Sequence, residues 1–209
     1  FPAVAPAVDE SLVELNAVNE YGSTTRTEES YLPYPFLSDA TLVEPYKKHE
    51  YNLKFGSDWC QDCNITYVIT SSDGVVLQSG DISVIFGVGS FDATITEVGK
   101  AKLTLTSTSD VRTTDIKLVL KFVRRELRSL TDEDRTLFLD TMYTLWSTDT
   151  VTGQALYGPD YKSIYYFNQI HLESPNYPNC DEFHTGPGFL VAHVYFEAYF
   201  QQSMRAVNP

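Results

Sequence analysis

Three of the four histidines in the chain lie in one short stretch near its C-terminal end, at His171, His184 and His193. Neutral imidazole is a common protein ligand of copper, zinc and iron, so this cluster predicts a metal site. Gly186-Pro187 separates the last two histidines, and proline suits the first position of a helix. We therefore expect a helix that carries His193 on its second turn. The zinc-protease pattern is different, because there two histidines four residues apart flank a glutamate. Three unrelated polar or core histidines are the alternative interpretation.

The three cysteines are a second candidate for chemistry. Cys60 and Cys63 form a Cys-x-x-Cys pair that a disulfide loop, a redox motif or half of a zinc site would explain. The flanking residues have the pattern of strands, which favours a disulfide between Cys60 and Cys63. Asn64-Ile-Thr66 follows and has the pattern of an N-glycosylation acceptor. Together these features favour the secretory pathway and a secreted protein. Cys180 is then a free thiol or the partner of a cysteine elsewhere.

The elements that must position these residues change in character along the chain. Residues 1–45 combine prolines with acidic and small polar residues and predict an extended arm or linker. Residues 46–122 alternate apolar and polar side chains, as at Tyr51, Leu53 and Phe55, and Asp73-Gly74 is a strong hairpin signal. This pattern predicts an antiparallel β-sandwich. We expect its strands to include residues 66–70, 75–77, 82–86, 91–95, 101–106 and 116–120.

Residues 123–209 have helical periodicity. Thr131 precedes three acidic residues, which is typical of a capped helix start. Further helices are predicted over residues 161–171 and 186–207, with loops over 148–159 and 172–179. The predicted fold class is therefore α+β, with a strand domain followed by a helical segment.

Charge limits the kinds of partner. The chain of 209 residues has a net charge of −13, whereas nucleic-acid backbones are bound by clustered Lys and Arg. We therefore expect no nucleic-acid partner. There is no run of about 20 apolar residues, so we also expect no membrane span. Because the chain begins with Phe1 rather than Met, we expect it to be a segment of a longer polypeptide.

The residues around the histidines resemble the first copper-binding half of the tyrosinase family. The run His184-Thr-Gly-Pro-Gly-Phe-Leu-Val-Ala-His193 is similar to the family's His-Gly-Gly-Pro-x-Phe-Leu-x-Trp-His-Arg segment. Met204-Arg-Ala-Val-Asn-Pro209 is similar to the turn that ends the family's following helix. Residues 123–135, with Phe138-Leu139, look like the helix that opens the tyrosinase core. The resemblance covers residues 122–209. It implies an incomplete four-helix bundle in which His171, His184 and His193 bind one copper ion, the copper A site.

The chain departs from the family pattern at several positions. Ala192, Val194 and Gln201 stand where the family usually has Trp, Arg and Glu. Groups around the ligands orient them and tune metal affinity, so these departures bear on activity more than on binding. In some relatives a cysteine two residues before the second histidine forms a thioether with it. Glu182 occupies that position here, so the thioether is not expected.

The resemblance implies two copper ions held by six histidines, but this chain has only four. The fourth, His49, lies in the strand region. We therefore expect the remainder of the polypeptide, or a second chain, to carry the copper B site. The implied function is a phenol or catechol oxidase that uses O₂ and acts on phenolic small molecules, with the isolated chain inactive. An oxygen carrier of the haemocyanin type is one alternative, and a non-catalytic extracellular scaffold with a degenerate tyrosinase-like domain is another.

Overall fold

The structure is a computed structural model that describes residues 13–23, 40–59, 61–109, 112–173, 184 and 186–209. It divides into two units, residues 1–123 and residues 124–209. We call them the strand unit and the helical unit and describe each by itself. The division falls one residue after the predicted end of the strand region at 122. The fold class is α+β, as predicted. None of the described helices is long and apolar enough to cross a membrane.

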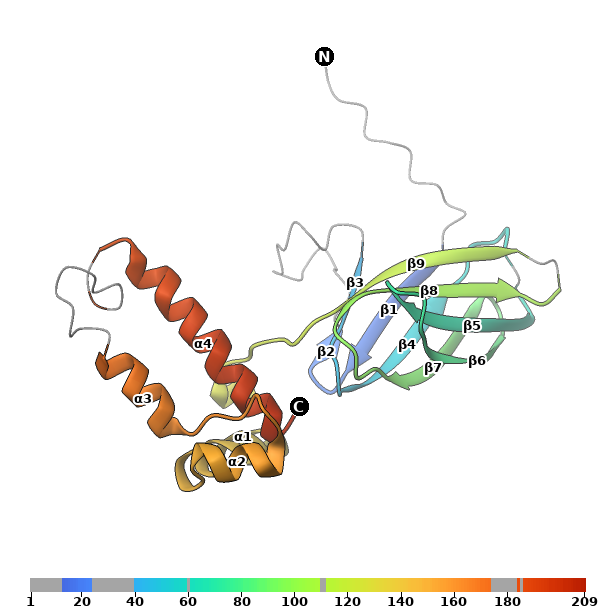
Figure 1. Ribbon diagram of the computed structural model, residues 1–209. Helices are drawn as coiled ribbons and strands as arrows, with labels where there is room; N and C mark the ends of the chain where they lie inside the picture. Colours follow the sequence, from blue (N-terminus) through green and yellow to red (C-terminus); the bar gives the residue numbers. More distant parts are fainter. Residues whose placement is uncertain (1–12, 24–39, 60, 110–111, 174–183, 185) are drawn as a thin grey trace, which may run out of the picture. The chain divides into compact units, whose positions relative to one another are not determined.

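The described part of the strand unit forms two sheets (Figure 1). One sheet has the strand order β2-β1-β4-β7 and the other has the order β3-β9-β8-β5-β6. The strands are β1 (Glu14–Asn19), β2 (Gly22–Ser23), β3 (Thr41–Val43), β4 (Lys48–Lys54), β5 (Cys63–Ser71), β6 (Val76–Val84), β7 (Val88–Thr94), β8 (Gly99–Ser107) and β9 (Thr113–Leu120).

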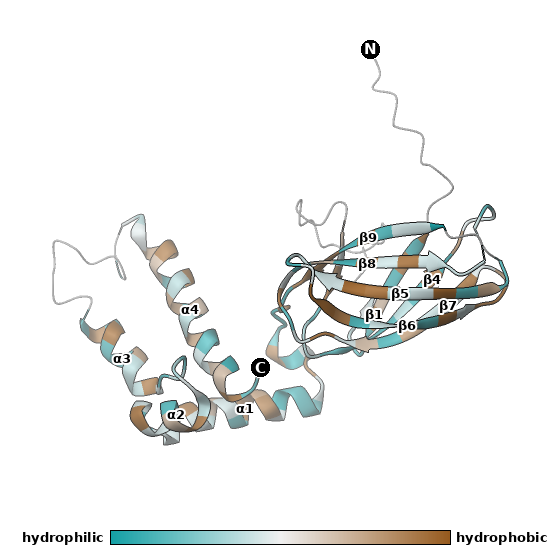
Figure 2. Cartoon of the chain, turned by 45° about the vertical axis from the view of Figure 1, so that its right-hand side comes forward, coloured by the Kyte–Doolittle hydropathy of each residue, from teal (hydrophilic) through white to brown (hydrophobic). Residues whose placement is uncertain are grey.

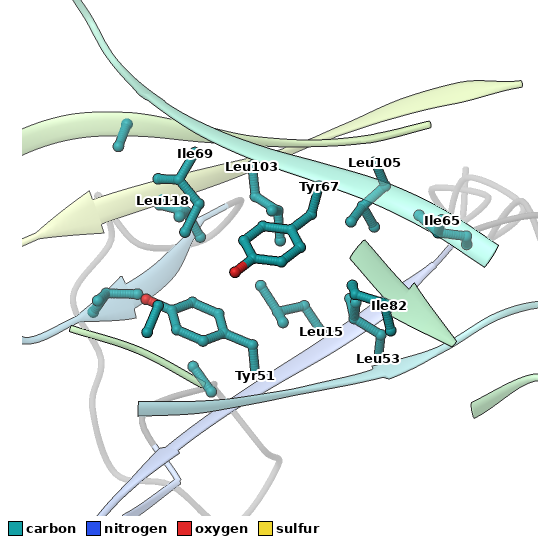
Figure 3. Packing of buried hydrophobic residues seen from close by; sticks show 14 of the residues in the cluster. Leu15, Tyr51, Leu53, Ile65, Tyr67, Ile69, Ile82, Leu103, Leu105 and Leu118 are labelled. Carbon is teal, nitrogen blue, oxygen red and sulfur yellow. The ribbon is translucent and has the colours of Figure 1, made fainter. Parts of the chain in front are cut away.

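Alternating side chains of both sheets form one hydrophobic core. Tyr51 and Leu53 of β4 are buried, as is Phe55 just after that strand, which confirms the predicted alternation. Figure 3 shows Tyr51 from one sheet and Tyr67 from the other within the same cluster. Phe91 of β7 joins the two rings, because its centroid lies 4.7 Å from that of Tyr51 and 3.8 Å from that of Tyr67. The alternation therefore sets which face of each sheet is buried.

The structure differs from the prediction of an arm or linker over residues 1–45. β1 lies between β2 and β4, and it contributes Leu15 and Ala17 to the core. The prolines that predicted an extended arm lie outside residues 14–19, so a short alternating strand sits between proline-rich stretches. Within residues 46–122 the described strand pairs are all antiparallel, as predicted, and β3, which lies before that range, pairs with β9 in parallel. A parallel pair needs a long connection, which the chain between residues 43 and 113 provides.

The hairpin between β5 and β6 forms at the predicted Asp73-Gly74 turn, where Gly74 has φ 80°. No helix lies within residues 66–86, as expected. β6 is one continuous strand where two short ones were predicted. Gly80 lies in its middle, and a Cβ atom there would come within 2.8 Å of Cε1 of Tyr67. Phe86 is not in a strand but in the β6–β7 turn, with φ 50° beside Gly87 at φ 72°.

The helical unit contains the short 3₁₀ helix η2 (Leu127–Ser129) and the helices α1 (Asp132–Ser147), α2 (Thr150–Tyr157), α3 (Ile164–Glu173) and α4 (Gly188–Val207). Thr131 caps α1 as predicted, because its hydroxyl accepts a hydrogen bond of 3.2 Å from the Asp134 amide. The prediction of a loop over residues 148–159 is wrong, since α2 lies there. Asp149 caps α2 by accepting from the amides of Val151 and Thr152.

Gly153 lies inside α2, although glycine is disfavoured inside helices and therefore indicated a loop. Its position is explained by Tyr161, which is fully buried. A Cβ atom on Gly153 would lie 1.9 Å from Cε1 of that ring, so only glycine allows the ring to pack there. The Tyr161 hydroxyl donates to the carbonyls of Thr144 and Thr148, at 3.1 and 2.9 Å, at the end of α1. Tyr161 thus ties α2 to α1.

Candidate metal centre

The three clustered histidines come from two helices and the segment between them. His171 lies in the last turn of α3 and His193 in the second turn of α4, as expected from Gly186-Pro187. His184 lies between the helices and is exposed, and its neighbours at 174–183 and 185 are outside the described residues. The structure therefore places all three candidate ligands at one end of the α3–α4 pair.

Aromatic packing holds α3 and α4 together beside the histidines. Phe167 of α3 is 1% exposed and lies one helical turn before His171. Its ring makes edge contacts with three aromatic rings of α4, with centroids between 5.1 and 5.7 Å apart. Edge-to-face pairs at such distances are favourable beyond the area they bury. The α4 rings are those of Phe196, Tyr199 and Phe200.

A hydrogen bond between two tyrosines also joins these helices. The Tyr199 hydroxyl donates to the Tyr166 hydroxyl at 3.4 Å. This bond, together with burial, raises the pKa of Tyr199 to about 12, so Tyr199 stays protonated as a donor at neutral pH. The α3–α4 contact near the histidines is therefore held by aromatic edges and by a phenol that carries no charge.

The imidazole rings are neighbours. The ring centroids of His171 and His184 lie 5.0 Å apart, and those of His171 and His193 lie 6.2 Å apart. Histidine nitrogens bind Zn²⁺ at about 2.0–2.1 Å and copper at a similar distance, so centroids of two ligands on one ion lie roughly 4.5–6 Å apart. The first pair falls inside that range and the second just outside it. Within the part of the chain that the structure describes, no group of three or more His, Cys, Asp or Glu side chains is close enough to hold a metal ion.

One histidine has a defined tautomer. Nδ1 of His193 lies 2.9 Å from the carbonyl oxygen of Phe189, one helical turn earlier. A carbonyl oxygen only accepts, so Nδ1 carries the proton, and in the neutral ring Nε2 carries the lone pair. Metal-binding histidines commonly donate their other nitrogen to a carbonyl in this way. The Phe189 ring also lies against His193, with centroids 4.3 Å apart.

The positions that depart from the tyrosinase pattern have different surroundings. Gln201 of α4, with its amide oxygen turned toward Arg124, accepts hydrogen bonds of 3.0 and 3.1 Å from that guanidinium. Arg124 also contacts Glu197 at 3.2 Å. Gln201 therefore still pairs with an arginine although it lacks the charge of a glutamate. Val194 is 62% exposed, and Ala192 is half-buried.

His49, the fourth histidine, belongs to the interior of the strand unit. It is fully buried, and its Nδ1 lies 3.0 Å from the carbonyl oxygen of Lys47. Its Nε2 faces two donors, the Asn19 side-chain amide at 3.3 Å and the backbone amide of Glu44 at 3.4 Å. Since both ring nitrogens are engaged by polar groups, His49 is explained as a structural residue of a buried hydrogen-bond network.

Cys63 is disulfide-bonded. Cys60 and Cys180 lie outside the described residues, so the pairing of Cys60 with Cys63 stays a prediction. Asn64 is exposed on β5, and its side-chain oxygen accepts from the Ser83 hydroxyl at 3.2 Å. Thr66 donates its hydroxyl to Asp81 at 2.9 Å. The side chain of the predicted glycosylation acceptor therefore faces solvent.

Sequence reasoning found the histidines but missed what positions them. Phe167 precedes His171 by four residues, and Phe196 and Phe200 follow His193 by three and seven. These are helical spacings, which put each aromatic residue on the same helix face as its histidine. That signal was present in the sequence. The carbonyl of Phe189 as a partner of His193 follows from the same one-turn rule.

Comparisons with known proteins add no functional information. No protein-family model matches the chain, and no curated protein matches it. Among solved structures it is similar to Salmonella alpha-2-macroglobulin, once as a mutant and once reacted with methylamine. Each is 15% identical at a TM-score of 0.32, over 41% of this chain and 6% of that chain. A β-glucosidase from Listeria innocua is 14% identical at a TM-score of 0.23, over 55% of this chain and 17% of that chain. The chain spans only a small part of these proteins, and similarities this low carry no argument.

Proposed function

We propose that the helical unit binds one copper ion through His171, His184 and His193 and is the copper A part of a tyrosinase-like oxidase. The observation that carries the proposal is that the ring centroid of His171 lies 5.0 Å from that of His184 and 6.2 Å from that of His193, at one end of the α3–α4 pair. The resemblance of residues 122–209 to the copper A half of tyrosinases supplies the choice of copper and the reaction class.

The donor set suits copper. An all-imidazole site accepts copper, zinc, iron or nickel, and among divalent ions copper has the highest intrinsic affinity. His193 is already held in the tautomer that offers Nε2. His171 is positioned by the packing of Phe167 against α4, whereas the side chain of His184 is exposed. We therefore expect small movements of the His184 and His193 side chains on metal binding.

In a complete site, a pair of copper ions supplies O₂ binding and oxidation of phenols to o-quinones. In this proposal the residues of the chain supply three ligands and the aromatic packing that holds them. The copper B site lies in the remainder of the polypeptide or in a second chain. We further propose that the strand unit is a β-sandwich support module and that α1–α4 are part of a four-helix bundle. A Cys60–Cys63 disulfide, a glycan on Asn64 and a secreted location complete the proposal.

Copper titration of the chain against a competing chelator tests the proposal. We expect one high-affinity copper per chain, and we expect His171→Ala, His184→Ala or His193→Ala each to weaken it at least about 100-fold. The matched control is Asn168→Ala, which changes an exposed residue on the same helix as His171. The chain alone should not oxidise catechol, because three ligands hold only one of the two ions.

A non-catalytic scaffold is the competing function, and the departures at Ala192, Val194 and Gln201 favour it. The titration separates the two functions. If the chain binds no copper, or if all three alanine variants bind it as the wild type does, the oxidase proposal fails and the scaffold stands. Copper-dependent oxidation of catechol by the isolated chain would also contradict the proposal, because it would need a second metal site within this chain.

A further inference from the structure

Helix α4 has two apolar faces. One face carries Phe196 and Phe200, which pack against Phe167 of α3. The opposite face carries a run of large apolar residues that are 62–73% exposed. They are Leu190, Val191, Val194 and Tyr195, and we call them the α4 stripe. Their spacing of one, four and five residues places them on one side of the helix.

The α4 stripe is unusual for a helix at a protein surface. A surface helix normally turns one apolar face inward and a polar face outward, whereas a helix that is apolar on both sides is normally buried on both. Apolar residues recur along the helices of this unit in Figure 2. The four side chains of the α4 stripe present on the order of 500 Å² of apolar surface, which is the size of the largest patches on ordinary monomers. Patches of this size are often functional.

We propose that the α4 stripe is the interface of a homodimer, in which the stripe of a second copy covers it. A standard interface buries about 800 Å² on each partner. The stripe supplies an apolar centre of suitable size, and polar residues beside it, such as Gln202, supply the rim. In a two-fold dimer the same patch faces itself, so it must be self-complementary. An uncharged apolar stripe meets this requirement.

Charge supports a second copy as the occupant. The chain carries a net charge of −13, so contact between most parts of two copies is repulsive. Residues 188–196 of α4 contain no Asp, Glu, Lys or Arg. The nearest acid on the helix, Glu197, is paired with Arg124 at 3.2 Å. The α4 stripe is therefore a surface on which two acidic chains meet with little like-charge repulsion.

Sedimentation equilibrium of the full chain over a range of concentrations tests the dimer. The measurement is made with a metal chelator present, so that its outcome does not depend on the copper proposal. We expect the wild type to form dimers and Val194→Asp to weaken them by about two orders of magnitude, as for a central interface residue. The matched control is Val151→Asp, which introduces the same charge on α2 at a valine that is 79% exposed. The control should dimerise as the wild type does.

Hydrogen exchange of residues 189–198 provides the second readout, and circular dichroism verifies that each variant is folded. We expect the amide protection of these residues to increase with protein concentration in the wild type and not in Val194→Asp. A wild type that stays monomeric throughout the concentration range would overturn the proposal. So would a dimer that survives Val194→Asp, or a monomer in which residues 189–198 are protected at every concentration, because another occupant would then cover the stripe.

Discussion

The two units bury apolar side chains to very different extents. The hydrophobic cluster of the strand unit draws on both sheets and contains residues from Leu15 to Leu120. Among the described residues of the helical unit, only Leu145, Tyr161 and Phe167 are buried apolar side chains. Most of the large exposed apolar side chains lie in the helical unit. The strand unit thus has a complete core, whereas the helices keep much of their apolar surface in contact with solvent.

The difference extends to polar groups. The strand unit encloses His49, Asn19 and Glu44 in a network that satisfies the ring nitrogens of the histidine. The helical unit places its three histidines at one end of α3 and α4, and His184 is exposed. The histidine of the strand unit is structural, whereas the histidines of the helical unit are accessible to a ligand.

The largest expected effect is that of Phe167→Ala. This substitution removes the ring that three aromatic residues of α4 surround, and such a change costs about 3–5 kcal/mol. Because the helical unit has so few buried residues, we expect it to unfold while the strand unit stays folded. Trp59 and Trp146, one in each unit, allow denaturation of each to be followed separately by fluorescence when the other is replaced by Phe.

The matched change in the strand unit is Leu103→Ala, at a residue that is fully buried in β8. It should cost about 2–5 kcal/mol and should shift only the Trp59 transition. If Phe167→Ala left the Trp146 transition unchanged, or if both variants shifted both transitions equally, the contrast between the units would be wrong.

Gly153→Ala should have the next largest effect. The new methyl group would overlap the buried ring of Tyr161 and displace it from its hydrogen bonds to the end of α1. Overpacking of this kind costs about 1–3 kcal/mol, although alanine favours helix more than glycine does. Denaturation of the Trp59→Phe form measures it. A more stable Gly153→Ala protein would show that Tyr161 does not pack on α2.

A change in the β6–β7 turn should act in the opposite direction. Phe86 is 84% exposed and has φ 50°, beside Gly87 at φ 72°. Two-residue turns of this kind favour Asn or Asp at the first position. Phe86→Asn should therefore stabilise the strand unit by about 0.5–1 kcal/mol, measured by the Trp59 transition. Phe86→Leu is the control, because leucine gives no such relief, and equal stabilities of the two variants would contradict this account of the turn.

The smallest effect should depend on pH. Asp115 accepts from the Thr104 hydroxyl at 2.7 Å and pairs with Lys102 at 3.0 Å, and both contacts hold its pKa below the usual value. A lowered folded-state pKa gives stability that is present above the unfolded pKa and lost as pH falls through the folded pKa. Asp115→Asn should lower the free energy of unfolding at pH 7 by no more than about a few tenths of a kcal/mol, because the pair is exposed, and the Tm should fall slightly. The difference should vanish in strong acid, and a difference that persists there would show that the carboxylate charge is not its source.

The sequence predicted the regular parts of the molecule well. The alternation at Tyr51, Leu53 and Phe55, the Asp73-Gly74 turn and the Thr131 cap each depend on neighbouring residues alone, and each was found. The errors arise where a distant residue decides. β1 exists because β4 pairs with it, and Gly153 is helical because Tyr161 packs on it. Such tertiary effects override local preference.

In the candidate site, too, the local features were predicted from the sequence and the contacts between distant residues were not. Histidine spacing and Gly186-Pro187 placed His171 and His193 on helices, because these signals are local. The distance between the imidazoles is set by Phe167 and the α4 aromatics, whose contacts join residues about 30 positions apart. The sequence therefore predicted the candidate ligands, and the structure was needed to find what packs beside them.

X-ray absorption spectroscopy of the chain loaded with one equivalent of copper tests the central claim most directly. We predict three imidazole nitrogens bound to copper at about 2.0 Å, with one imidazole fewer in His184→Ala and no change in Asn168→Ala. A copper environment dominated by water or carboxylate oxygens, or a wild-type spectrum that His184→Ala leaves unchanged, would contradict the claim that His171, His184 and His193 form one metal site.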